Sequence, residues 1–558
     1  MIEFARVCDA VAATPAKNAK VERLASYLAT LDADDLIATS RFLTGAPLAA
    51  SDERRLAIGG RTILAAARKV WHLGDADLGL AYRTTGDLGE ALGTLFREPD
   101  APALFAETLT PASFLRVLDD IASAGGANAG RRREYVCERI LRACATGREA
   151  VYAIKILTGD LRIGLREGLV LDAIAAAFGR DPNAVRRAAM AAGDVGAVAS
   201  AARDDTLAAL EVRYGAPIGF MLASPIAFGT TYRELDAEGW IVEDKFDGIR
   251  AQAHKHGDRV KLFSRTFREI GRSYPEIVAA LARQDGNFIL DGEILALRDG
   301  RALPFRYLQA RLQRNDPSPE MQAAVPVAFV AFDALAAGAR FLIDEPLGER
   351  RSLLATIVRS ETALHVAAWR ALENSSTPET IAGLFDASRA RGNEGLVFKR
   401  SDAPYVPGRR GKWWLKLKRE LSTLDCVVVR VEWGHGKRAS VLSDYTFAVR
   451  RDAAGEELLP IGKAYSGLTD AEIARMTEWF LAHPAGPQGR RAFAVEPQMV
   501  VEIAFDIIQK STLHASGYAL RFPRIARLRP DKRAADASTL ADVEGIYEEV
   551  LAREGVAR

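Results

Sequence analysis

A single lysine stands between carboxylates near the middle of the chain, where an apolar run ends. The stretch Glu243-Asp244-Lys245-Phe246-Asp247-Gly248-Ile249-Arg250 follows the apolar residues 239–242 and leads into an alternating run at 249–254. These patterns predict a buried strand, a turn at Gly248 and a second strand. A lysine amine is nucleophilic only without its proton, and burial or nearby cations favour that form by lowering its pKa from about 10.4. Lys245 is the candidate nucleophile; a surface ion pair with Glu243 or Asp247 is the alternative.

Two further sets of charged side chains lie on predicted strands. Asp291 and Glu293 are two residues apart on the apolar strand 288–294, so both carboxylates face one side. A carboxylate on such a strand is costly unless it is paired or binds a metal. Lys416 and Lys418 share one face of a later strand. Since two neighbouring ammonium groups repel each other, an anion such as a triphosphate explains them better than chance.

Taken together, these segments resemble the motifs of one enzyme family. The pattern Lys-x-Asp-Gly-x-Arg at residues 245–250 resembles the first motif of the covalent nucleotidyltransferases, which are the ATP- and NAD-dependent DNA ligases, RNA ligases and mRNA capping enzymes. The later motifs follow in the family's order: Arg265, Asp291-Gly292-Glu293, Phe332-Asp333, Glu394-Gly395-Leu396-Val397-Phe398-Lys399, the strand from Arg410 through Lys412 to Lys418, and the basic segment Leu520 to Lys532. Phe398 stands where leucine is commoner, and the tyrosine often found after Phe332 is absent.

The resemblance implies a site as well as a reaction. Lys245 would attack the α-phosphate of ATP, AMP would pass to the 5′-phosphate of a nick, and the 3′-hydroxyl would displace AMP and seal the strand. It further implies nucleotide contacts from Glu243, Arg250, Arg265, Glu293, Phe332, Arg410, Lys416 and Lys418, with Mg²⁺ held by Glu293 and Glu394. For Phe332 the residue type alone favours a place in the core, because phenylalanine is so often buried.

Three domains are expected, since 558 residues exceed what one hydrophobic core usually serves. The pattern of residues 1–205 predicts successive helices, and no strand-like alternation competes with it. Residues 206–420 hold the motifs and are rich in predicted strands, as in an adenylation (nucleotidyltransferase) domain with antiparallel sheets. Residues 421–558 carry short strands separated by glycine turns, which fits an OB-fold. The predicted fold class is therefore a multidomain chain: all-α, then α+β, then β.

A glycine-flanked basic turn occurs inside the helical part. Residues 155–165 place Arg162 between Gly159 and Gly164 just before a helix. Such a turn can bring backbone amides and an arginine close to phosphates, although a plain helix connection explains the composition equally well. The segment resembles the signature turn of the helical DNA-binding domain of archaeal and eukaryotic replicative ligases. That resemblance implies nicked double-stranded DNA as the partner.

The composition limits the kinds of binding site, metal site and cellular location that are expected. The net charge is only +2, from 75 basic and 73 acidic residues, so any polyanion site depends on local clustering. Four scattered cysteines form neither a disulfide framework nor a Cys-x-x-Cys zinc pair. Since the sequence contains neither a signal peptide nor an apolar run of about 18 residues, we expect a cytoplasmic protein without a membrane segment. We also expect a monomer, and no sliding-clamp peptide is recognisable.

Other nucleotidyltransferases and a non-catalytic DNA-binding protein are alternative interpretations, and each predicts sequence features that can be checked. NAD-dependent ligases carry a four-cysteine zinc module, which this sequence lacks. Capping enzymes and RNA ligases share the core, but the helical leader argues against them. A non-catalytic protein that binds DNA ends would have lost some of the charged motif residues, yet Lys245, Glu293, Glu394, Lys416 and Lys418 are all present. An ATP-dependent DNA ligase of the bacterial kind is therefore the prediction.

Overall fold

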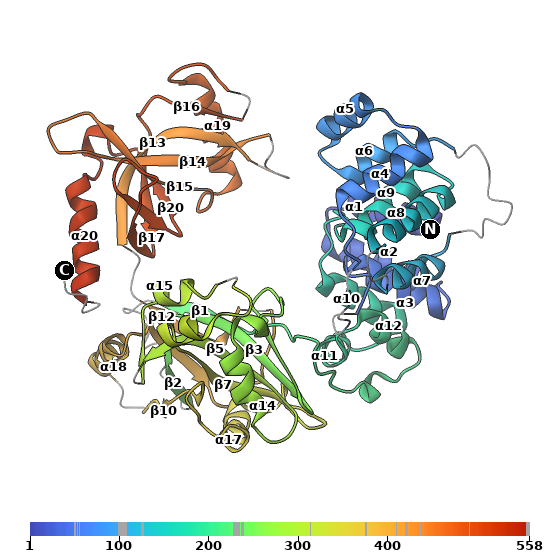
Figure 1. The fold of residues 1–558 in the computed structure, drawn as a ribbon, viewed down its shortest axis with the longest axis horizontal. Coiled ribbons are helices and arrows are strands. Elements are labelled where there is room, and N and C mark those ends of the chain that lie inside the picture. The colour runs from blue at the N-terminus through green and yellow to red at the C-terminus, as the bar shows by residue number, and fades with distance from the viewer. Residues whose placement is uncertain are drawn as a thin grey trace. The chain divides into compact units, whose positions relative to one another are not determined.

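The computed structural model describes residues 1–558 apart from 50–51, 53, 55, 99–108, 124–127, 227–234, 236–238, 299, 313, 374–376, 409, 419–421, 435–437, 439, 490 and 554–558. It separates into two compact units, Met1–Leu417 and Lys418–Arg558. Figure 1 colours the helical region blue to blue-green, the first sheet region green to yellow, and the second unit orange to red. The unit boundary lies close to the predicted one at 420/421, whereas the predicted boundary at 205/206 falls inside the first unit and stays a prediction.

The first part of the chain is helical, as predicted, and no strand occurs among the described residues before Leu222. Its α-helices are α1 (Ile2–Ala12), α2 (Lys17–Leu28), α3 (Ala33–Leu43), α4 (Gly60–Trp71), α5 (Asp75–Thr85), α6 (Leu88–Thr94), α7 (Pro111–Ala122), α8 (Ala129–Ala143), α9 (Gly147–Thr158), α10 (Glu167–Phe178), α11 (Pro182–Ala192) and α12 (Val195–Arg203). Several begin at a residue whose side chain accepts a backbone N–H, for example Asp32 before α3 and Thr110 before α7.

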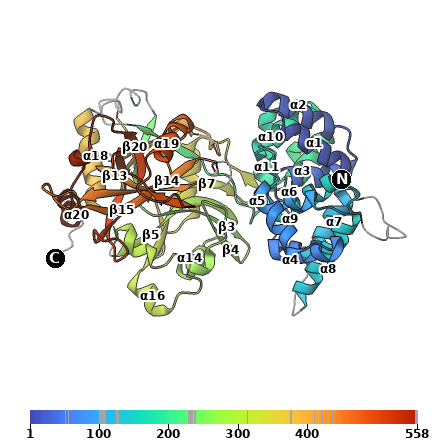
Figure 2. The same ribbon diagram turned by 90° about the horizontal axis from the view of Figure 1, so that it is seen from above.

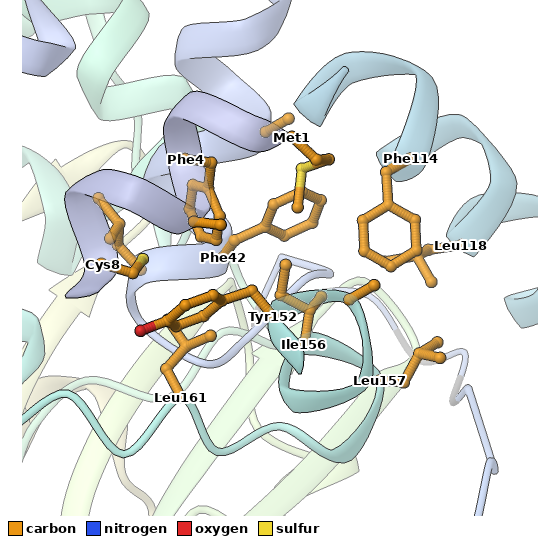
Figure 3. Close-up of a cluster of buried hydrophobic side chains, with 14 of the residues drawn as sticks. Met1, Phe4, Cys8, Phe42, Phe114, Leu118, Tyr152, Ile156, Leu157 and Leu161 are labelled. Carbon is orange, nitrogen blue, oxygen red and sulfur yellow. The ribbon is translucent and has the colours of Figure 1, made fainter. Parts of the chain in front are cut away.

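One apolar core holds these helices together. The ring of Phe4 lies edge-on to Phe42 and to Tyr152, with centroids 6.2 Å apart in each pair, and Phe42 contacts Phe114 (Figure 3). These aromatic residues come from α1, α3, α7 and α9, so helices distant in sequence share one core. Burial of such rings is the main stabilising contribution here.

The second part of the first unit is built on two sheets. Its strands are β1 (Leu222–Ile226), β2 (Trp240–Lys245), β3 (Ile249–His256), β4 (Arg259–Ser264), β5 (Phe288–Arg298), β6 (Arg301–Ala302), β7 (Val327–Ala337), β8 (Arg340–Phe341), β9 (Leu364–Val366), β10 (Trp369–Ala371), β11 (Gly395–Arg400) and β12 (Arg410–Lys418). Its α-helices are α14 (Pro275–Ala282), α15 (Phe305–Gln309), α16 (Pro319–Ala324), α17 (Leu347–Ile357) and α18 (Pro378–Ala390).

The two sheets form the inner layers of this region. One has the strand order β1-β12-β11-β2-β10, and the other β4-β3-β5-β7-β8 with β6 and β9 at its margins. Most pairs are antiparallel, while β1 with β12 and β7 with β9 are parallel. Helices α14 and α17 pack on the second sheet, where α14 lies beside β3 and β4 (Figure 2), and α18 packs on the first sheet. Apolar side chains from both sheets pack between them.

Gly248 allows the chain to cross from one sheet to the other. Strand β2 ends at Lys245 in the first sheet, and β3 begins at Ile249 in the second. A Cβ atom at Gly248 would lie 2.3 Å from the carbonyl oxygen of Ile294 and 2.8 Å from Cγ of Glu293. Only glycine allows the backbone to approach β5 this closely.

The second unit is rich in strands, as predicted. Its strands are β13 (Ser422–Trp433), β14 (Leu442–Arg450), β15 (Leu458–Ala464), β16 (Ala492–Ala494), β17 (Val500–Phe505), β18 (Ile507–Lys510), β19 (Tyr518–Arg521) and β20 (Arg524–Leu528), with helices α19 (Asp470–Ala482) and α20 (Leu540–Arg553). The main sheet runs β15-β14-β13-β17-β20, with β16 beside β13. Phe480 of α19 and Val543 of α20 join the apolar core of this unit.

Candidate active site

Lys245 and Glu394 meet where two paired strands end. Gly395 of β11 lies opposite Lys245 of β2, and the Glu394 N–H donates to the Lys245 carbonyl oxygen at 2.7 Å. The side-chain ammonium of Lys245 forms an ion pair with the Glu394 carboxylate, and both side chains are partly exposed, at 21% and 28%. The predicted nucleophile and a predicted metal ligand are thus neighbours, although 149 residues separate them in sequence.

Glu293 lies in the same cluster. It pairs across the strands with Arg250, and Lys245, Arg250, Asp291 and Glu394 are the charged groups that act on it. Burial raises the pKa of the Glu293 carboxyl to about 8, against the attraction of Lys245 and Arg250, which lowers it. A cation bound beside Glu293 would favour the charged form of this carboxyl.

These carboxylates fit a Mg²⁺ ion that is shared with a nucleotide. Mg²⁺ is usually held by one or two carboxylates together with phosphate oxygens and water, and Glu293 and Glu394 offer hard oxygen ligands. Among the described residues no set of three or more acidic, histidine or cysteine side chains forms a complete protein cage. The donor set suits a metal that arrives with phosphate.

Arg250 is fixed by a buried acid. Its guanidinium donates to both oxygens of Asp291, at 3.1 and 2.7 Å, and to the Met221 carbonyl oxygen at 2.6 Å. Asp291, which is fully buried, also accepts from the Tyr405 hydroxyl at 2.6 Å. The sequence pattern places Asp291 on the same strand face as Glu293, but it does not indicate that Arg250 and Tyr405 are its partners.

Phe332 is buried beside two cations rather than in a purely apolar core. The Lys399 ammonium lies 4.2 Å from the Phe332 ring centroid and 4.3 Å from that of Trp414, and the Arg250 guanidinium lies 5.5 Å from Phe332. Burial lowers the pKa of Lys399, while the nearby Glu243 opposes that shift. Cation–π contacts of this kind are strengthened when water is excluded.

Glu243 is almost entirely buried and is neutralised from two sides. One carboxylate oxygen lies 2.6 Å from the Lys399 ammonium, and the other lies 2.7 Å from Nη1 of Arg351 on α17. The second oxygen, Oε1, makes no hydrogen bond of acceptable geometry. The ion-pair partners of Glu243 are therefore Lys399 and Arg351 rather than the ammonium of Lys245. Sequence patterns did not mark Arg351, because nothing in its spacing indicates a partner more than 100 residues away.

For the remaining predicted residues the structure gives a strand face, an exposure or a backbone pairing rather than a side-chain contact with the Lys245 cluster. Lys416 and Lys418 alternate with Leu415 and Leu417, whose side chains pack under α18, so the lysines share the opposite face of β12 with Trp414. Arg265 is exposed in the turn after β4. The backbone of Arg410 pairs with Leu222, but its side chain lies outside the described residues.

The pairing of Lys245 with Glu394, in one charge cluster with Glu293 and Arg250, is the arrangement expected from the resemblance to the covalent nucleotidyltransferases. Three family descriptions match successive parts of the chain: "DNA ligase N terminus" at residues 1–175, "ATP dependent DNA ligase domain" at 220–418 and "ATP dependent DNA ligase C terminal region" at 438–532. The chain is 45% identical to a probable DNA ligase of Koribacter versatilis, over 98% of this chain and 96% of that one. It is 34% identical to a DNA ligase of Archaeoglobus fulgidus, over 98% of each chain. The chain belongs to the ATP-dependent DNA ligase family.

Comparison with solved structures shows the same fold over most of the chain. The structure named Pmar-Lig_PreS3 aligns with a TM-score of 0.56 at 15% identity, covering 94% of this chain and 99% of that one. A second one, Pmar-Lig_Pre., gives 0.54 at 16% identity. The predictions of a ligase and of ATP as its nucleotide are confirmed by the family. Among the described residues no helix is long and apolar enough to cross a bilayer.

Proposed function

We propose that Lys245 is the residue that carries AMP in this ATP-dependent DNA ligase. Its amine, once deprotonated, forms a bond to the α-phosphorus of ATP as the bond to pyrophosphate breaks, and the lysine proton leaves to solvent. The observation that carries this assignment is the position of Lys245 beside Glu394 and within the charge cluster of Glu293 and Arg250. AMP then moves to the 5′-phosphate of the nick, and the 3′-hydroxyl displaces it.

The other predicted residues have distinct proposed roles around the nucleotide. Glu243 and Phe332 bind the base, while Arg265 and Glu293 contact the nucleotide near its ribose. Arg250, Arg410, Lys416 and Lys418 offset negative charge on the phosphates. Glu293 and Glu394 hold Mg²⁺, which, when bound, stabilises charge that develops on the phosphate oxygens. Because its three donor groups are already engaged by Asp291 and Met221, Arg250 acts from a fixed position.

The proposed partner is nicked duplex DNA, bound by one copy of the chain in the cytoplasm. An OB-fold for residues 421–558 is supported by the Lys418 boundary, by the short strands around β13 and by the packing of α19 and α20. In the helical region Arg162 forms ion pairs with Asp160 and Asp87. Its side chain is still half exposed, so a phosphate could compete with these acids for it.

Covalent labelling tests the lysine assignment. Incubation with α-labelled ATP followed by denaturing electrophoresis should label the wild-type chain but neither Lys245→Ala nor Lys245→Arg, because arginine keeps the charge yet essentially never deprotonates. The exposed Lys17 gives a control, since Lys17→Ala should still take the label. Lys245→Ala should nevertheless join a nick whose 5′-phosphate already carries AMP, which requires no attack by the lysine. Label on Lys245→Ala would refute the proposal.

A further inference from the structure

Helix α17 carries two consecutive buried arginines that serve different partners. Arg350 is 1% exposed and donates to both oxygens of Asp333, at 2.8 and 2.9 Å, as well as to the Ala403 carbonyl oxygen. Arg351 is 4% exposed and is directed at the proposed base-binding residues. A buried guanidinium is costly unless its donors have acceptors, and each arginine has its own set; in Arg351 both Nη atoms are engaged, while Nε has no hydrogen-bond partner.

Arg351 connects three segments that surround the proposed base site. Its Nη1 lies 2.7 Å from Oε1 of Glu243 on β2 and donates to the Phe332 carbonyl oxygen on β7 at 2.9 Å. Its Nη2 donates to the Ala367 carbonyl oxygen, just after β9, at 2.6 Å. The planar, forked guanidinium can hold these groups at fixed relative positions, whereas a lysine ammonium cannot reach all three.

The chemistry of Glu243 makes this connection relevant to the choice of nucleotide. An ionised carboxylate only accepts hydrogen bonds. At position 6 of the ring adenine carries an amino group and guanine a carbonyl oxygen, so a carboxylate fixed opposite that position favours adenine and opposes guanine. Lys399 and Arg351 offset the cost of burying that charge, and Oε1 still lacks a hydrogen bond that an amino group could supply.

We propose that Arg351 is a positioning residue that holds Glu243 and the Phe332 backbone around the base, and that it thereby sets the preference for adenine over guanine nucleotides. This inference rests on the proposed contacts of Glu243 and Phe332 with the base. Arg351 itself does not touch the nucleotide. Its effect is exerted through the position of the Glu243 carboxylate.

The test compares Arg351→Lys with its neighbour Arg350→Lys. The rate of covalent labelling is measured over a range of ATP and GTP concentrations, with thermal unfolding recorded for each variant. Arg351→Lys should raise the half-saturating ATP concentration more than it lowers the maximal rate, and should reduce the ATP-to-GTP preference at least tenfold. Arg350→Lys removes an equally buried fork from the same helix and should lower the unfolding temperature while leaving the preference within twofold of wild type.

A double-mutant comparison separates this proposal from the one it rests on. Glu243→Gln should reduce the ATP-to-GTP preference by itself, and adding Arg351→Lys to it should change the preference little further, because both act through one carboxylate. An unchanged preference in Glu243→Gln would contradict the proposed base contact. If the ATP-to-GTP preference changes in Glu243→Gln but stays at the wild-type value in folded Arg351→Lys, only the role of Arg351 is overturned. Equal losses of preference in Arg350→Lys and Arg351→Lys would also overturn it, since general destabilisation would then explain both.

Discussion

Replacing Gly248 by alanine should damage the active site more than the size of one methyl group suggests. The added Cβ would lie 2.3 Å from the Ile294 carbonyl oxygen, where ordinary contacts begin at 3.4 Å, so β5 and the turn must separate by about 1 Å. A backbone carbonyl cannot rotate away as a side chain could. Overpacking of this kind costs about 1–3 kcal/mol, and a misplacement of about 1 Å can slow a reaction about 100-fold.

The expected loss of stability is measurable by thermal unfolding. For a domain the size of the matched region 220–418, a cost of about 1–3 kcal/mol lowers the unfolding temperature by about 2–12 °C. Gly383→Ala is the matched control, because nothing lies within 4 Å of its added Cβ inside α18 and alanine favours a helix by up to about 1 kcal/mol. Covalent labelling by ATP should be slowed in Gly248→Ala alone. If Gly248→Ala unfolds and labels like wild type, the close approach of the turn to β5 is not what requires glycine there.

Three further predictions concern other parts of the chain. If the Phe332 ring binds the base, Phe332→Tyr should keep ATP affinity better than Phe332→Ala in the labelling assay; equal losses would make the residue part of the core only. Burial lowers the pKa of His254 to about 3, so the unfolded chain takes up this proton first, and stability should fall as the pH drops below about 6.5, by at most about 1.4 kcal/mol per pH unit. Urea unfolding at pH 7, 6 and 5 should show a weaker dependence in His254→Gln, and equal slopes would contradict this account. Deleting residues 1–205 should weaken nick binding, and the slope of the logarithm of the binding constant against the logarithm of salt concentration should become shallower by about 0.9 for each phosphate that is no longer neutralised. Residues 210–558 alone should still form the AMP adduct. An unchanged salt slope would mean that the turn containing Arg162 only connects two helices.

Features that depend on local sequence could be predicted well. The apolar, alternating runs around Lys245 correspond to β2 and β3, and the one at Glu293 corresponds to β5. Period-two alternation also placed Lys416 and Lys418 on one face of β12. The helical character of the first part followed from helix-forming residues and glycine breaks, because both act over a few residues.

Partners distant in sequence could not be predicted in the same way. The buried contacts of Glu243 with Lys399 and Arg351, and of Arg250 with Asp291, depend on how two sheets and a helix pack together. No short pattern encodes such a pairing, since each residue alone is compatible with a solvated surface position. The order of the strands in the two sheets was likewise not accessible, because it is set by long-range contacts rather than by periodicity.

The most direct measurement of the central claim is to locate the AMP on the protein. The wild-type chain is incubated with ATP and Mg²⁺, digested under conditions that preserve a phosphoramidate, and examined by peptide mass spectrometry. The account predicts one AMP on the peptide that contains Lys245, and its disappearance when nicked DNA is added before digestion. AMP on another lysine, or an adduct that persists after nicked DNA is supplied, would contradict it.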